Sequence, residues 1–184
     1  MFIRYILKSV FSVIASCLFV GYTLGYKNDG KEVTWNSWNE GCGQTSFKVD
    51  AAPKTFKALG SAYGRDSGHV FFMGGIIDEA DPKTFKVLKD GYDHDDIQAY
   101  YRDGVLNNSD SKSLQSLGER YARDKSQVYF DEEVIESADL ASFEVHTCYL
   151  TEDKKNFYWL GKALNVQDKS TFTVLGDKDV LCTR

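Results

Sequence analysis

The stretch Tyr121-Ala-Arg-Asp124-Lys-Ser-Gln-Val128-Tyr-Phe130 recurs along the chain at a step of 29 residues, and this recurrence decides the fold. Five kinds of position keep the same register in four copies. They are Asp66, Asp95, Asp124 and Asp153; Asp81, Asp110, Asp139 and Asp168; Phe71, Tyr100, Tyr129 and Tyr158; Thr84, Ser113, Ser142 and Thr171; and Phe85, Leu114, Phe143 and Phe172. One period shared by unrelated positions is the signature of a repeat protein.

The repeats divide most of the chain into units of equal length. Four units occupy 63–91, 92–120, 121–149 and 150–178, a degenerate unit lies within 27–62, and 179–184 form a short tail. In the degenerate unit, Ala52-Pro-Lys-Thr-Phe56 matches Asp81-Pro-Lys-Thr-Phe85, whereas the front half around Trp35–Gln44 has diverged. A terminal unit that departs from the consensus is typical of a cap, because one of its faces has no neighbouring repeat.

Each unit reads as a β-hairpin followed by a tail. In the third full unit, Val128–Phe130 is β-branched and aromatic, which favours a strand, and Val134-Ile135 resumes the apolar pattern after a short polar break. The tail begins with a turn such as Asp81-Pro-Lys-Thr84. Phe85–Leu88 fits either a strand or one helical turn, and we expect a third strand, with a few short helical turns along the array. We therefore expect a mainly β fold, a tandem array of about five 29-residue β-hairpin-containing repeats with an N-terminal signal or anchor helix.

Residues 1–26 differ from the repeats. Arg4 and Lys8 precede the uncharged run Ser9–Tyr26, and a basic region before an apolar stretch predicts export. Three outcomes fit: cleavage after Thr23-Leu24-Gly25, retention as a single membrane anchor, or lipidation at Cys17 in the lipobox-like Ile14-Ala-Ser-Cys17. All three predict that the rest of the chain lies outside the cytoplasm, in the periplasm or cell envelope.

The charge balance excludes one class of partner. The 184 residues include 22 basic and 27 acidic side chains, a net charge of -5, and removal of the export segment makes it about -7. An acidic chain has no general electrostatic affinity for phosphate backbones, so nucleic acid is not an expected partner. Membrane contact is expected only through the N-terminal segment.

The cysteines bear on the same compartment. Besides Cys17, the chain has Cys42, Cys148 and Cys182, and an oxidising compartment permits one disulfide among these three, with the pairing left open. No pair has CxxC spacing, so the sequence predicts neither a redox motif nor a thiolate zinc site.

The repeats resemble the DKNYG family of bacterial exported proteins over about 50–178. Asp153-Lys-Lys-Asn-Phe-Tyr158-Trp-Leu-Gly161 is similar to the first half of that family's repeat, and Glu79-Ala-Asp81-Pro-Lys-Thr-Phe85-Lys-Val-Leu88 to the second half. The resemblance implies an exported or lipid-anchored repeat protein. It implies no activity that can be carried over to particular residues.

Catalytic and metal-binding patterns are sparse. The aspartates that open each hairpin are interpreted as turn caps rather than Ca²⁺ ligands, because each unit supplies one carboxylate and no calcium loop is present. The densest acidic cluster, Asp93-His94-Asp95-Asp96, is interpreted as a solvated loop. His69, His94 and His146 fall in no recognised catalytic motif, although His146 replaces a leucine of the other units. We expect a non-enzymatic protein without metal or cofactor.

Two function classes remain. The first is a protein that binds another envelope or periplasmic protein, for example as an immunity or assembly factor. The second is a glycan- or cell-wall-binding module, for which Trp35, Trp38 and Trp159 are the candidate binding residues. Adjacent aromatic residues in each hairpin place one ring on each strand face, and stacking between repeats accounts for the outer ring as well as ligand contact does.

Overall fold

The computed structural model describes residues 24–164, 166 and 169–171. The predicted N-terminal signal or anchor helix lies outside these residues, as do Cys17, Cys182 and the predicted tail 179–184. Within the described part, no helix has the length and apolar character needed to cross a membrane.

The described residues fold into five small antiparallel sheets, each a meander of strands in chain order. The first sheet contains β1 (Gly25–Asn28), β2 (Val33–Asn39) and β3 (Gly43–Val49). The second contains β4 (Lys57–Ala58), β5 (Tyr63–Arg65), β6 (Val70–Phe72) and β7 (Gly75–Ile77). The third contains β8 (Lys86–Val87), β9 (Tyr92–His94), β10 (Ala99–Tyr101) and β11 (Gly104–Val105).

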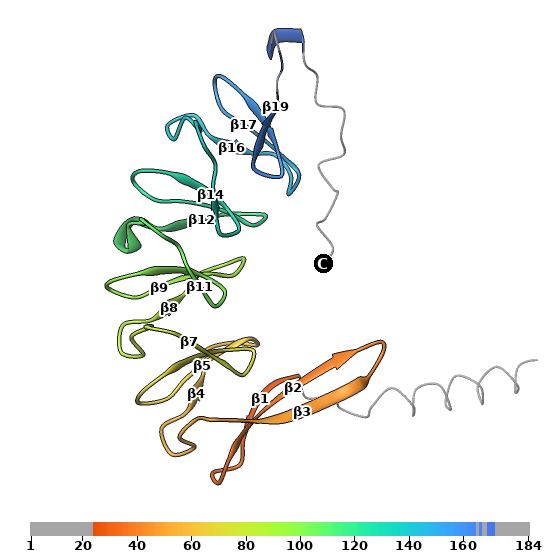
Figure 1. Cartoon of the computed structure of the whole chain (residues 1–184), viewed down its shortest axis with the longest axis vertical. Coiled ribbons are helices and arrows are strands. Elements are labelled where there is room, and N and C mark those ends of the chain that lie inside the picture. Colours follow the sequence, from red (N-terminus) through yellow and green to blue (C-terminus); the bar gives the residue numbers. More distant parts are fainter. Residues whose placement is uncertain (1–23, 165, 167–168, 172–184) are drawn as a thin grey trace, which may run out of the picture.

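The remaining two sheets repeat this plan. The fourth contains β12 (Gln115–Gly118), β13 (Tyr121–Arg123), β14 (Val128–Phe130) and β15 (Glu133–Val134). The fifth contains β16 (Glu144–Val145), β17 (Leu150–Glu152), β18 (Phe157–Trp159) and β19 (Lys162–Leu164). Two single turns of 3₁₀ helix, η1 (Ser111–Ser113) and η2 (Lys169–Thr171), occupy tail positions. Figure 1 shows the sheets following one another along a curved array, which confirms the mainly β repeat fold.

The predicted third strand exists and links the units. The tail strand β8 pairs with β9 of the following hairpin, so Lys86 lies opposite His94 and Val87 opposite Asp93. Each four-stranded sheet therefore takes its first strand from the tail of one predicted unit and its other three strands from the next. Because each four-stranded sheet combines strands of two units, neighbouring units depend on each other to complete a sheet.

One strand of each sheet was not expected from the sequence. The sequence pattern predicts a strand at Val128–Phe130 and none at Tyr121–Arg123, yet Tyr121–Arg123 forms β13, which pairs with β14 from Tyr121 opposite Phe130 to Arg123 opposite Val128. The turn is confined to the residues that follow Asp124. Three residues are too few to display the alternation that identifies a strand.

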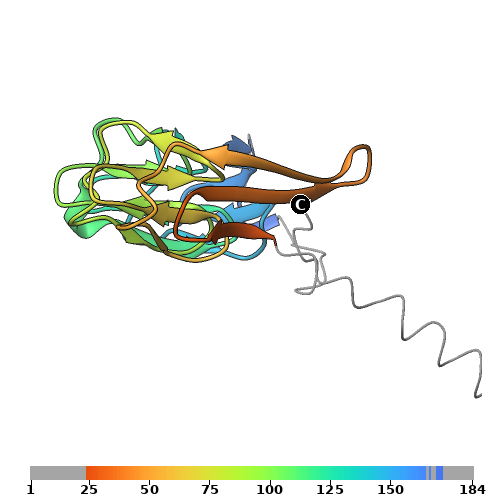
Figure 2. The same cartoon turned by 90° about the horizontal axis from the view of Figure 1, so that it is seen from below.

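The first sheet is a three-stranded version of the repeat with an enlarged hairpin. Tyr26, Asp29 and Val33 precede Tyr63, Asp66 and Val70 by 37 residues each, and β1 pairs with β2 as β5 pairs with β6. The longer step arises because β2 and β3 each run for 7 residues, whereas β6 and β7 each run for 3. We call Val33–Val49 the projecting hairpin, because in Figures 1 and 2 it extends well beyond the stacked sheets.

The hydrophobic core lies between successive sheets rather than within one. Tyr63, Val70 and Ile77 of one sheet cluster with Phe85 of the following tail and with Tyr100 of the next sheet. The same set recurs two units later as Tyr121, Val128, Ile135, Phe143 and Tyr158. A 29-residue unit is too small to bury a core alone, so stacking supplies the burial.

Candidate interaction surface

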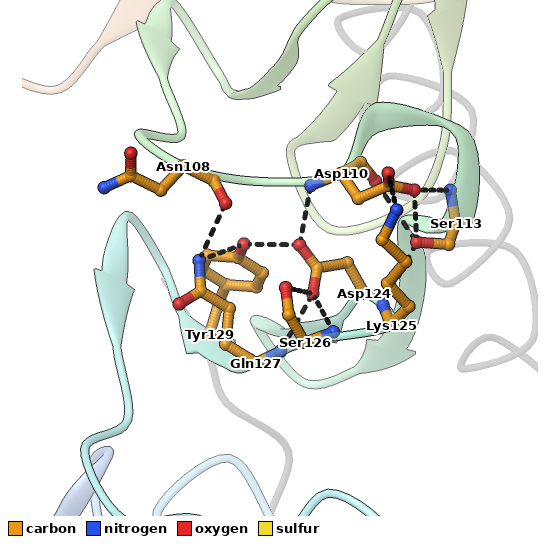
Figure 3. Close-up of polar contacts among 8 residues, drawn as sticks. All are labelled: Asn108, Asp110, Ser113, Asp124, Lys125, Ser126, Gln127 and Tyr129. Carbon is orange, nitrogen blue, oxygen red and sulfur yellow. Dashed lines mark hydrogen bonds and ion pairs between the residues drawn. The ribbon is translucent and has the colours of Figure 1, made fainter.

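The repeated aspartates hold the array together. In Figure 3, Asp124 Oδ1 accepts hydrogen bonds from the backbone N–H groups of Ser126 (2.7 Å) and Gln127 (2.8 Å), which close the turn between β13 and β14. Its other oxygen, Oδ2, accepts from the Asp110 N–H (2.7 Å) and from the Tyr129 hydroxyl (2.8 Å). One carboxylate thus fastens its own turn, the preceding tail and the adjacent strand.

The same network recurs in the units on either side. Asp95 accepts from Ile97, Gln98, Asp81 and the Tyr100 hydroxyl, and Asp153 accepts from Lys155, Asn156, Asp139 and the Tyr158 hydroxyl. These contacts agree with the interpretation of the aspartates as turn caps. Since N–H and O–H donors already occupy both oxygens, the arrangement is scaffold rather than a cation site.

The electrostatics of this network agree with its geometry. Burial alone would raise the pKa of Asp124, but hydrogen bonds from backbone N–H groups, first that of Asp110, outweigh burial and hold the pKa below its usual value. Burial and the carboxylate of Asp153 raise the pKa of Tyr158 to about 12, so this hydroxyl remains a donor at neutral pH. In each aspartate–tyrosine pair, an ionised carboxylate therefore accepts a hydrogen bond from a neutral hydroxyl.

The repeated hydroxyl residues complete the scaffold. The Ser113 hydroxyl donates to Asp110 Oδ1 (2.6 Å) and accepts from the Lys125 N–H (3.0 Å), so it joins the tail to the next turn. Thr84 and Ser142 make the equivalent contacts. The residues that define the repeat are thus used by the fold, and candidates for function are residues that the repeat does not explain.

One acidic cluster differs from its prediction. Asp93-His94-Asp95-Asp96 is not a solvated loop, because Asp93 is fully buried in the middle of β9 and Asp95 caps its turn from a buried position. The Asp93 carboxylate lies close to the Tyr63 hydroxyl, and burial outweighs this contact and raises the pKa of Asp93 to about 8. The equivalent positions in the other sheets hold Gly64, Ala122 and Thr151.

The three candidate tryptophans do not form one site. Trp35 is only 6% exposed and packs edge-on against Tyr26 with ring centroids 4.8 Å apart, so it belongs to the core. Trp38, 51% exposed, lies on the opposite face of β2. Trp159, 50% exposed, stacks on Tyr149 in the sheet at the other end of the array (Figure 1). Two separated tryptophans therefore remain as surface candidates.

The exposure of Trp159 follows from its place in the array. Phe130 occupies the equivalent position one unit earlier, and a Cβ added to Gly161 of the next unit would lie 2.8 Å from the Phe130 Cβ. Trp35 is covered in the same manner by Gly74. In each pair, the glycine turn of the following sheet packs on the aromatic side chain, and no such turn follows Trp159 within the described residues.

The structure establishes the disulfide state of two of the cysteines. Cys148 is buried and disulfide-bonded, whereas Cys42 is a free, exposed cysteine near the tip of the projecting hairpin. The pairing of Cys42 with Cys148 is therefore not formed, and Cys182 lies outside the described residues. His69 is exposed near Asp66, with 3.8 Å between Nδ1 and Oδ1, and His146 Nε2 lies 2.7 Å from Glu152 Oε1.

The projecting hairpin presents the most unusual exposed surface. Its strands pair continuously from Val33 opposite Val49 to Asn39 opposite Gly43, so it is an ordered arm. Trp38 lies across from Gln44 near the tip, and the half-exposed Phe47 lies against Gly74 of the next sheet. This surface could have been found in the sequence, because the aromatic and glycine residues between Trp35 and Gln44 interrupt the 29-residue step.

The stacked hairpins and their aspartate network define a tandem β-repeat protein. The model of the DKNYY family matches residues 21–105 and 48–162, which together span most of the chain. The chain belongs to the DKNYY family, in agreement with the repeat resemblance seen in its sequence. No curated protein and no solved structure matches it.

Proposed function

We propose that this chain is a non-catalytic, exported repeat protein of the bacterial envelope or periplasm that acts by binding another protein. The observation that carries the proposal is the projecting hairpin, an ordered arm that interrupts an otherwise regular array. It exposes half of a tryptophan side chain, and tryptophans in such positions are enriched among residues that contribute most to protein contacts. The basic and then apolar N-terminal pattern supports export.

The residue inventory supports a binding role over catalysis. The repeated carboxylates are saturated by backbone donors, and identical groups at four separate sites do not bring unlike groups together at one substrate. The raised pKa of Asp93 follows from its burial between sheets, away from any surface that a substrate reaches. An acidic, rigid surface suits a partner with a neutral or basic contact patch.

A matched pair of tryptophans tests this proposal. Trp38 and Trp159 are equally exposed but lie at opposite ends of the array. In affinity capture from envelope extract, Trp38→Ala should lose a specific partner that the native chain and Trp159→Ala both retain. Capture of no specific partner by the native chain, or equal capture by all three proteins, would contradict the proposal.

A second candidate is glycan or cell-wall binding through the Tyr149–Trp159 pair. Their rings stack with centroids 5.4 Å apart and 19° between planes, and half of Trp159 is exposed, which offers an aromatic platform for a sugar face. Sedimentation with peptidoglycan tests this candidate, with Trp159→Ala as the variant and Trp38→Ala as the control. Unchanged sedimentation of Trp159→Ala would exclude it.

A further inference from the structure

The last sheet carries a cluster that the repeat does not explain. Glu144, His146 and Glu152 each offer one ligand-type atom, and these atoms all lie within 4.8 Å of one another. Glu144 on β16 lies directly opposite Glu152 on β17. Like charges at directly opposed positions of an antiparallel pair are destabilising. Lys169 Nζ offsets part of this repulsion at Glu152, whereas no ion pair of Glu144 is seen among the described residues.

The other sheets provide an internal comparison. The three positions hold Lys57, Leu59 and Arg65 in the second sheet, Lys86, Leu88 and His94 in the third, and Gln115, Leu117 and Arg123 in the fourth. In the last sheet a lysine or glutamine position becomes glutamate, a leucine becomes histidine, and a basic position becomes glutamate. Three coordinated changes to metal-ligating side chains in one unit are not required by the fold, since three sheets form without them.

We propose that Glu144, His146 and Glu152 form a solvent-accessible Zn²⁺ site. An imidazole nitrogen and two carboxylate oxygens are ligands that Zn²⁺ accepts, and three protein ligands leave at least one position for water or for a group of a partner. His146 Nε2 and Glu152 Oε1 now share a hydrogen bond of 2.7 Å, and they need to separate to roughly 3.4 Å for tetrahedral coordination. A side-chain rotation supplies that change.

A neighbouring lysine positions one ligand. Lys169 Nζ lies 2.5 Å from Glu152 Oε2, and the Asp153 carbonyl and the Phe157 ring, 4.6 Å away, hold the ammonium group in place. This contact uses one oxygen of Glu152 and leaves Oε1 directed toward His146. Fixing a ligand by an outer contact is common at metal sites. The site is independent of the projecting hairpin and of the protein contact proposed for it.

Calorimetric titration of the full chain with zinc chloride tests the site. All proteins carry Cys42→Ser, because the exposed free thiol would itself bind zinc. We expect one zinc ion per chain, an affinity about tenfold or more weaker in His146→Leu and in Glu144→Lys, and no change in His69→Asn. Leucine and lysine are the residues of other units at these positions, so both variants should keep the native thermal midpoint.

Titration with Co²⁺ gives a second readout, since its visible absorption reports the ligand field. The native site should give a saturable spectrum at one equivalent that His146→Leu lacks. Absence of saturable zinc binding in the Cys42→Ser chain would overturn the proposal. Binding that persists unchanged in both His146→Leu and Glu144→Lys, or that disappears in His69→Asn, would overturn it equally.

Discussion

The aspartates that recur every 29 residues each accept several hydrogen bonds in the described part of the chain. A single carboxylate such as Asp124 accepts from two amides of its own turn, one amide of the preceding tail and one tyrosine hydroxyl. Their short side chains reach backbone donors that the turn would otherwise leave unpaired. This accounts for the strict recurrence of aspartate without any ligand.

Asp124→Ala tests the role of the network. It leaves several part-buried donors without an acceptor, and we expect the free energy of unfolding to fall by about 3 kcal/mol. Urea unfolding followed by circular dichroism measures this loss. The control is Asp96→Ala, whose side chain is exposed, and it should change little. Equal free energies of unfolding for the two variants would show that the Asp124 hydrogen bonds do not stabilise the fold.

Asp93 should make the protein less stable as pH rises. Its pKa is raised in the folded state, to about 8, so the folded chain binds a proton more tightly than the unfolded chain. The stability associated with this proton is complete below the unfolded pKa of about 4 and is lost as pH rises through about 8. Between these values the expected loss is about 1.4 kcal/mol per pH unit at most.

The matched variant for this effect is Asp93→Ala, because Ala122 occupies the equivalent position in the next sheet. We expect Asp93→Ala to flatten the decline of stability between pH 5 and 8 and to be more stable than the native chain at pH 8. Urea titrations at several pH values provide the comparison. Parallel pH profiles for the two proteins would show that Asp93 does not carry the effect.

At the scale of elements, the tail phenylalanine couples two sheets. Phe143 precedes β16, and its ring contacts Tyr121 of one sheet and Tyr158 of the next, with centroid distances of 6.1 and 5.7 Å. Phe143→Ala removes this buried ring, and we expect a cost of about 3–5 kcal/mol in the free energy of unfolding. Phe47→Ala, at a half-exposed ring, is the control. An unchanged thermal midpoint in Phe143→Ala would contradict the inter-sheet core.

The elements also show what the sequence could and could not predict. The period, the strand Val128–Phe130 and the tail strand follow from a register repeated four times, which averages out local ambiguity. Tyr121–Arg123 was missed because a strand of 3 residues has no visible alternation. The equivalence of Tyr26 and Tyr63 was missed because the enlarged hairpin shifts the first unit out of the 29-residue step.

The candidate sites were less predictable for a related reason. Exposure of Trp38 and burial of Trp35 depend on strand register, and exposure of Trp159 depends on whether a glycine turn packs on it as Gly161 packs on Phe130. The cluster of Glu144, His146 and Glu152 depends on pairing between β16 and β17, although the replacement of leucine by His146 was visible in the sequence. Residues that depart from the repeat pattern were thus the useful sequence signal for candidate sites. Only the structure shows which of these residues lie close to one another.

At the scale of the whole molecule, the stacked sheets form one continuous scaffold. Every four-stranded sheet takes a strand from the preceding tail and shares a core with its neighbour, so stability is a property of the stack. At the base of the projecting hairpin, Val33 pairs with Val49 as Val70 pairs with Ile77 in the second sheet. None of the other described sheets has a hairpin of this length. We therefore infer that the arm is dispensable for folding and reserved for contact with a partner.

The most direct test replaces residues 34–48 with the sequence of 71–76, which converts the projecting hairpin into the short hairpin of the second sheet. Val33 and Val49 would keep the pairing that Val70 and Ile77 have, and an aromatic residue would replace Trp35 at the position of Phe72. Thermal unfolding should then give a cooperative transition at a midpoint equal to or above that of the native chain. A midpoint lowered by many degrees, or loss of cooperative unfolding, would show that the arm belongs to the scaffold.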